Sequence, residues 1–126
     1  MKILVLPGDG IGPEITQATL TVLNVLNTQF KLGLEWDQRD IGVATLKSQG
    51  TTLPADVMEA ARQAPGIILG PVDHLVYAER EKGGINPSGE FRVKLDLFAN
   101  IRPAISRMGV GLSGKPIDRS EEHTSE

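Results

Sequence analysis

The sequence predicts an α/β fold in which a mostly parallel sheet is flanked by helices. Two short, uninterrupted apolar runs, at residues 2–6 and 66–69, are typical of buried parallel strands. Longer segments between them carry apolar residues at every third or fourth position, which indicates helices. Strands that alternate with helices favour this fold class, and ligands then bind beyond the carboxyl ends of the strands.

A glycine-rich loop joins the first strand to the first helix. The strand at residues 2–6 ends at Pro7-Gly8, and Pro13 falls in the first turn of the helix, where a missing N–H costs nothing. The apolar residues that predict this helix are Ile15, Ala18, Val22, Leu26 and Phe30. Residues 31–33 end it.

The middle of the chain predicts four more elements. They are a strand at 34–41, a helix at 43–49 closed by Gly50, a helix at 54–64 stopped by Pro65-Gly66, and a strand at 66–69. Thr52 is a candidate cap for the second of these helices. Residues 70–87 are rich in glycine, proline and charge, so we expect a loop, and loops often carry function.

Composition limits the classes of function. The 126 residues are 40% hydrophobic, which suits a single core, and the formal net charge of -3 provides no basic field for nucleic acid. The chain has no cysteine, so disulfides and thiolate metal sites are excluded. The apolar run at residues 3–6 is too short for a signal sequence or a membrane span. We expect a cytoplasmic protein that binds neither nucleic acid nor a membrane.

The last eight residues differ from the rest of the chain. Residues 119–126 carry no apolar side chain and match the translation of a common sequencing adapter, although an ordinary polar terminus is the alternative. We therefore expect one domain at residues 1–118, truncated, followed by an adapter scar at 119–126.

Two arginines suggest a binding site for a small dicarboxylate. A guanidinium is always charged and its planar fork of donors matches a carboxylate, so Arg92 and Arg102 would together select a polyanion. If residues 88–95 are helical, Ser88 and Arg92 share one face because they are four residues apart. Arg102 would then follow a short strand, held extended by Pro103.

The glycine loop allows two interpretations. Glycines between a strand and a helix can bind the pyrophosphate of a dinucleotide, but that fingerprint requires a small residue where this chain has Pro13. The favoured alternative is a tight turn in which glycines adopt positive φ and Asp9 lies near the start of the helix.

Three motifs carry a family resemblance. They are Leu6-Pro7-Gly8-Asp9-Gly10-Ile11-Gly12-Pro13-Glu14, then Gly70-Pro71-Val72, and finally Leu95-Asp96-Leu97-Phe98-Ala99-Asn100-Ile101-Arg102-Pro103. In this order and spacing they resemble the isocitrate and isopropylmalate dehydrogenase family, which are metal-dependent β-decarboxylating dehydrogenases. The resemblance covers residues 1–118 and implies the amino-terminal part of an isopropylmalate dehydrogenase-like fold.

The resemblance assigns substrate roles to four residues. It implies that Arg92 and Arg102 clamp the malate portion of the substrate, and that Asn86 and Ser88 contact its variable group. The polar pair favours a polar substituent, or a small substrate such as malate or tartrate, over an isopropyl group. The alternative is that residues 86–88 form only a turn and a helix cap.

The resemblance also implies a cofactor and a reaction. NAD or NADP would contact Ile11, Val72, Asp73 and His74, although His74 suits an ordinary loop residue better than an acid or base. The reaction would be oxidative decarboxylation of a 2-hydroxy acid, assisted by Mg²⁺ or Mn²⁺. The metal ligands and the catalytic acid and base belong to family regions beyond this chain, so we assign none of them here. We expect an inactive fragment, whose full-length form is a homodimer.

Two other functions stay open at this point. A non-enzymatic α/β domain could use the arginines to hold a phosphate or regulatory anion without a metal. A purely structural piece of a larger assembly would not depend on either arginine.

Overall fold

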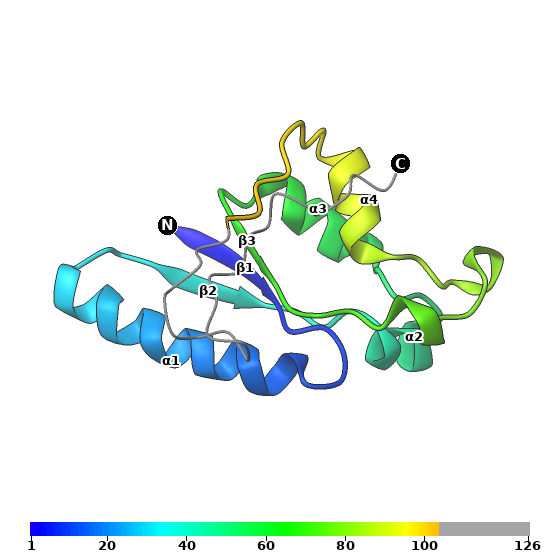
Figure 1. Ribbon diagram of the computed structural model, residues 1–126, viewed down its shortest axis with the longest axis horizontal. Helices are drawn as coiled ribbons and strands as arrows, with labels where there is room; N and C mark the ends of the chain where they lie inside the picture. The colour runs from blue at the N-terminus through cyan, green and yellow to red at the C-terminus, as the bar shows by residue number, and fades with distance from the viewer. Residues whose placement is uncertain (104–126) are drawn as a thin grey trace, which may run out of the picture.

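A three-stranded parallel sheet forms the centre of the molecule. The computed structural model describes residues 1–103, and its sheet has the order β2-β1-β3. The strands are β1 (Lys2–Leu6), β2 (Glu35–Gln38) and β3 (Ile67–Leu69). Lys2 is paired with Glu35, and Leu4 with Ile67, so all three carboxyl ends lie at one edge of the sheet (Figure 1). The predicted α/β class and parallel sheet are confirmed.

Helices cover both faces of this sheet. Helix α1 (Gly12–Phe30) lies on one face, and α3 (Ala55–Gln63) and α4 (Pro87–Lys94) lie on the other, with α2 (Val43–Gln49) near the carboxyl edge (Figure 1). Two short 3-10 turns, η1 (His74–Val76) and η2 (Arg80–Lys82), interrupt the loop between β3 and α4. No helix of residues 1–103 has the length and apolar character needed to cross a membrane.

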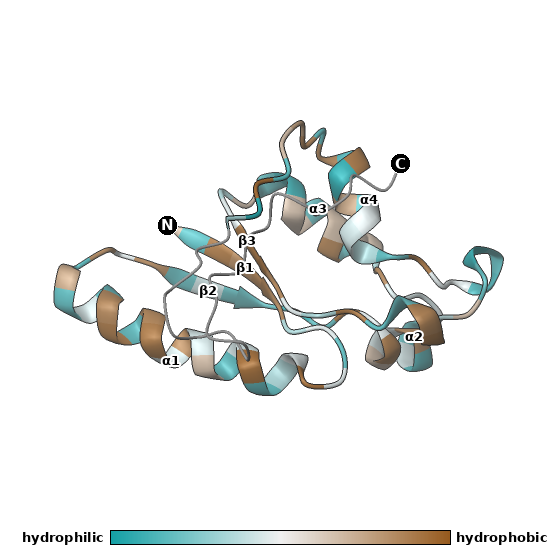
Figure 2. Ribbon diagram, viewed as in Figure 1, coloured by the Kyte–Doolittle hydropathy of each residue, from teal (hydrophilic) through white to brown (hydrophobic). Residues whose placement is uncertain are grey.

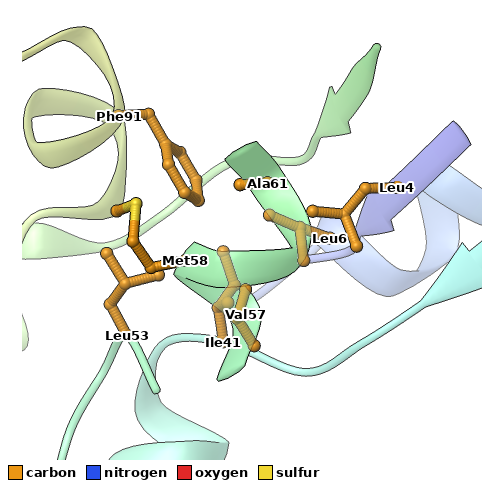
Figure 3. Close-up of a cluster of buried hydrophobic side chains, with 8 residues drawn as sticks. All are labelled: Leu4, Leu6, Ile41, Leu53, Val57, Met58, Ala61 and Phe91. Atoms are coloured by element: carbon orange, nitrogen blue, oxygen red, sulfur yellow. The ribbon is translucent and has the colours of Figure 1, made fainter. Parts of the chain in front are cut away.

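The main core lies between β1 and α3. Leu4 and Leu6 point to the same face of the sheet because side chains alternate along a strand. The buried cluster consists of Leu4, Leu6, Ile41, Leu53, Val57, Met58, Ala61 and Phe91 (Figure 3). Phe91 belongs to α4, so this cluster holds α4 against α3. Full burial of a side chain of this size stabilises a fold by roughly 1.5 to 3 kcal/mol.

The apolar stripe of α1 does not face the sheet. The helix is confirmed, but its buried residues are Gly12, Thr16 and Leu20. The exposed apolar residues of α1 are Ile15, Val22, Val25, Leu26 and Phe30, which contribute the brown bands on that helix in Figure 2. Leu20 is thus the one large apolar side chain among the three buried residues of α1, which the hydrophobic spacing alone does not reveal.

Two sequence predictions about local structure were wrong. Thr52 does not cap α3, because Pro54 occupies the cap position; the buried Thr52 hydroxyl instead donates to the Ile85 carbonyl and accepts from the Ile85 N–H. No strand precedes Arg102, since residues 97–103 have no regular structure. A strand needs a hydrogen-bonded neighbour, and local sequence does not supply one. The second strand is also shorter than expected.

The end of β3 requires a glycine. A Cβ atom on Gly70 would lie 2.0 Å from the carbonyl oxygen of Pro7, whereas on Gly66, at the other end of the strand, its nearest neighbour would be Ile3 Cδ1 at 3.4 Å. We expect Gly70→Ala to lower the free energy of unfolding by about 2 kcal/mol or more through overpacking. The matched Gly66→Ala should change it by about 0.5 kcal/mol at most.

Urea unfolding, followed by the fluorescence of Trp36, the single tryptophan, measures both variants. Equal losses of stability in the two variants would contradict the close approach at Gly70.

Candidate functional site

Two loops meet at the carboxyl edge of the sheet. The Asp9 N–H, in the loop after β1, donates to the Pro71 carbonyl at 2.8 Å, and the Gly70 N–H donates to the Leu6 carbonyl at 2.8 Å. Gly8 adopts a φ of +78°, and a Cβ atom there would lie 2.1 Å from the Pro71 oxygen. The glycine loop therefore packs against its neighbour as a tight turn, in agreement with the interpretation that the sequence favoured.

These two loops carry the four residues predicted to contact a cofactor. Ile11 is exposed at the amino end of α1, and Val72 is partly buried against the core cluster. Asp73 and His74 follow directly, both exposed, and His74 opens η1. The structure thus places the four residues on two adjoining loops, although their role in cofactor binding stays a prediction.

Asp9 joins three segments at this edge. Its carboxylate accepts hydrogen bonds from the Val43 N–H at 2.7 Å, from the Asp73 N–H at 3.1 Å and from the Tyr77 hydroxyl. Burial, and secondarily the hydrogen bond to Asp9, raise the pKa of Tyr77 far above its usual value. Tyr77 is therefore a neutral phenol at any ordinary pH, and its hydroxyl donates a hydrogen bond to Asp9.

Helix α4 begins with a cap that the sequence suggested. The Asn86 side-chain oxygen accepts from the Ser88 N–H at 3.1 Å and from the Gly89 N–H at 3.4 Å, and Pro87 occupies the first turn. These bonds satisfy N–H groups that have no partner within the helix. The cap that was the alternative role for residues 86–88 is therefore present. A role for Asn86 and Ser88 in substrate binding stays a prediction.

Arg92 lies on the exposed side of α4. The buried residues of the helix are Pro87, Glu90 and Phe91, whereas Arg92 is exposed and stands one turn after Ser88. The expectation that Ser88 and Arg92 share a face is confirmed by the helix bounds.

A buried carboxylate holds α4 against the preceding loop. Glu90 is 9% exposed, and its oxygens lie 3.1 Å from Arg80 Nη2, in η2, and 2.8 Å from Lys94 Nζ. Hydrogen bonds from Lys94 and then Arg80, opposed by burial, hold the pKa of the Glu90 carboxyl below its usual range. The cations paired with Glu90 in residues 1–103 are Arg80 and Lys94, so the charge of Arg92 is not neutralised by it.

The end of α4 sets the path of the chain toward Arg102. Asp96 has a positive φ of 52°, and the Leu97 N–H donates to the Arg92 carbonyl at 3.0 Å, which is the pattern of a Schellman motif. Leu97 then lines a hollow of about 420 Å³ together with Ala61 and Ile67. The chain therefore turns back along α3 toward the start of β3, as the orange segment of Figure 1 shows.

The structure does not show Arg92 and Arg102 converging on one site. Arg102 is exposed, as Arg92 is, and within residues 1–103 no hydrogen bond or ion pair links either guanidinium to another side chain. Their convergence on one substrate stays a prediction. The same part of the chain contains no cluster of three or more histidine, aspartate or glutamate residues that could hold a metal ion.

Comparison with known proteins identifies the family. The family model for isocitrate/isopropylmalate dehydrogenase matches residues 2–119, which is nearly the whole chain. This chain belongs to the isocitrate/isopropylmalate dehydrogenase family.

Individual members of the family agree with this assignment. The chain is 40% identical over 113 residues to a 3-isopropylmalate dehydrogenase of Methylococcus capsulatus, covering 83% of this chain and 30% of that one. A second 3-isopropylmalate dehydrogenase, from Hahella chejuensis, is 40% identical over 109 residues, with 82% and 29% covered. The chain thus spans about 30% of the length of these curated relatives.

Solved structures support the same fold. An isocitrate dehydrogenase from Methylococcus capsulatus superposes with a TM-score of 0.68 at 32% identity, over 83% of this chain and 29% of that one. A β-decarboxylating dehydrogenase from Thermococcus kodakarensis gives a TM-score of 0.60 at 22% identity, covering 76% of this chain and 27% of that one, and shares the fold.

Sequence reasoning missed several residues that shape this family site. Asp9 was expected near a helix start, but its partners in α2 and in the loop at residues 73–77 were not foreseen. Glu90 as the ion-paired support of α4, and Thr52 as the partner of Ile85, were also missed. The only local signal was an acidic residue on the buried side of a helix, which requires a cationic partner.

The Glu90 cluster leads to a stability prediction. We expect Glu90→Gln to lower the free energy of unfolding by about 1 to 2 kcal/mol near neutral pH, since the two cations lose a charged acceptor but remain hydrated. Because the pKa of Glu90 is lowered in the fold, its contribution is present above the pKa of an unfolded glutamate and is lost as pH falls through the folded pKa.

Urea unfolding between about pH 6 and about pH 3 tests this linkage. The difference between Glu90→Gln and the unsubstituted chain should shrink as pH falls. The exposed Glu81, replaced by glutamine, serves as control. A difference that is independent of pH would contradict the assignment.

Proposed function

We propose that this chain supplies the substrate arginines of an NAD- or NADP-dependent enzyme that oxidatively decarboxylates a 2-hydroxy dicarboxylate. The observation that carries the proposal is Arg92, an exposed guanidinium on α4 that is not neutralised by Glu90 and lies one turn from Ser88. Membership of the dehydrogenase family supports the same reaction class. Arg102 would complete the clamp when substrate is bound.

Two side chains at the start of α4 would contact the variable group of the substrate. The Asn86 oxygen is occupied by the helix cap, so its amide Nδ2 remains as a donor toward a substrate oxygen. The Ser88 hydroxyl can donate beside it. A polar substituent, or a small substrate of the malate or tartrate type, suits these two groups better than an isopropyl group does.

The cofactor would bind at the carboxyl edge, against Ile11, Val72, Asp73 and His74. Mg²⁺ or Mn²⁺ would lower the pKa of the substrate hydroxyl when bound. Membership of the family supports placing the metal ligands and the acid and base in family regions outside this chain. The complete enzyme would be a cytoplasmic homodimer with small-molecule partners.

The chain alone is expected not to turn over. Assays of the 126-residue chain with Mg²⁺ or Mn²⁺, NAD or NADP, and a panel of 2-hydroxy acids should give no reduced cofactor above background, because the acid, base and metal ligands are missing. A chain that continues through the full family length, with paired aspartates, a lysine and a tyrosine beyond Asp118, serves as the positive control. Clear turnover by the short chain would refute this part of the proposal.

The arginine clamp can be tested in that longer chain. Arg92→Lys and Arg102→Lys should each lower kcat/KM by roughly a hundredfold, because lysine keeps the charge but loses the bidentate fork. Arg62→Lys is the matched control, since the Arg62 guanidinium binds a backbone carbonyl, that of Lys94, at 3.0 Å. Steady-state kinetics with the best substrate measures all three variants.

Two other outcomes correspond to the competing functions. Phosphate or sulfate binding by the short chain that needs no metal and is lost in Arg92→Lys would favour an anion-binding domain. Unchanged ligand binding and kinetics in both lysine variants would favour a purely structural role.

A further inference from the structure

Within residues 1–103, the loop segment 73–77 is hydrogen-bonded to the rest of the molecule through one side chain, that of Asp9. Residues 73–76 are all exposed, and Leu75 is 85% exposed, so apolar packing contributes little to the position of this segment. Among the described residues, two hydrogen bonds join residues 72–78 to the rest of the molecule, and both end on the Asp9 carboxylate. One comes from the Asp73 N–H and the other from the Tyr77 hydroxyl.

The position of Asp9 is itself set by its surroundings. A Cβ atom on Gly42 would lie 2.2 Å from Asp9 Oδ1, so the carboxylate rests directly against the Cα of a glycine. The Val43 N–H donates to the same oxygen at 2.7 Å, which leaves Oδ2 for Asp73 and Tyr77. The carboxylate is thus fixed from one side by α2 and holds the loop from the other.

Tyr77 is suited to be the outer partner of this contact. Its raised pKa keeps the phenol protonated, so the hydroxyl remains a donor to the anionic carboxylate. Hydrogen bonds to a charged acceptor are stronger than those between neutral groups. Arg80, which follows shortly after Tyr77, is anchored separately by its ion pair with Glu90, so the Asp9 contact supports the part of the loop that precedes η2.

We propose that Asp9 and Tyr77 form a latch that positions residues 72–77 at the carboxyl edge of the sheet, which makes Tyr77 a positioning residue for the nicotinamide cofactor. The cofactor half of this inference rests on the proposed function, since Val72, Asp73 and His74 lie inside the latched segment. The structural half rests on the hydrogen bonds alone.

Hydrogen exchange on the 126-residue chain tests the structural half. Tyr77→Phe removes only the hydroxyl, and the backbone amides of Asp73 and Val76, the two in this segment that donate hydrogen bonds, should then exchange roughly tenfold faster, while those of α3 stay unchanged. Leu75→Ala, a change on the same loop at an exposed side chain, is the matched control and should not alter exchange. Equal exchange in Tyr77→Phe and the unsubstituted chain, or uniformly fast exchange in both, would overturn the latch.

A second variant acts from the other side of the contact. Asp9→Asn keeps the size of the side chain but replaces one acceptor oxygen by a donor, so the same amides should exchange faster still, together with that of Val43. Trp36 fluorescence reports whether this variant remains folded. If it does not, Tyr77→Phe alone decides.

Kinetics in the longer chain tests the cofactor half. Tyr77→Phe should raise the KM for the nicotinamide cofactor severalfold and change kcat and the KM for the hydroxy acid less than twofold, a split that a general loss of stability would not produce. A loosened loop with an unchanged cofactor KM would overturn the positioning role. Absence of any dehydrogenase activity in the unsubstituted longer chain would instead count against the proposed function, and the exchange result would stand.

Discussion

The carbonyl of Pro7 is the point on which the rest of the molecule depends. Pro7 directly follows the buried central strand. Two glycines lie very close to its carbonyl oxygen: Gly12 at the start of α1 and Gly70 just after β3. A Cβ atom on either glycine would lie within 2.1 Å of that oxygen. This contact brings the loops after β1 and β3 together, and the hydrogen bond from Asp9 N–H to Pro71 then holds them. The glycines are needed because the backbones of these segments approach each other closely. This need accounts for the glycines without the dinucleotide fingerprint.

The candidate site has two parts that are supported differently. The loops at the carboxyl edge are connected by the carboxylate of Asp9, which accepts hydrogen bonds from segments distant in the sequence. The arginine face is organised by packing of Phe91 on the core and by the Glu90 cluster, which binds α4 to η2. Burying a carboxylate is costly unless cations accompany it, and Arg80 and Lys94 supply those cations here.

Exposed apolar surface follows from the way α1 packs. Its apolar stripe lies away from the sheet, and further apolar side chains are exposed after α4, where Phe98 is 100% exposed. In an amphipathic surface helix the apolar face is normally the buried one, whereas here the described residues cover the face of α1 that carries Gly12, Thr16 and Leu20. The chain spans about 30% of the length of its curated relatives. Its described core cluster lies on the side of the sheet that α3 and α4 cover.

Sequence alone determined the features that depend on neighbouring residues. The order of strands and helices, the positive φ of Gly8, the Asn86 cap and the shared face of Ser88 and Arg92 all follow from short-range spacing and backbone geometry. Tertiary structure decided which face of α1 is buried, that Thr52 binds Ile85 rather than capping α3, that Asp9 binds Tyr77, and that no strand leads to Arg102. Those outcomes depend on contacts between residues far apart in the chain, and such contacts have no local periodicity from which they could be inferred.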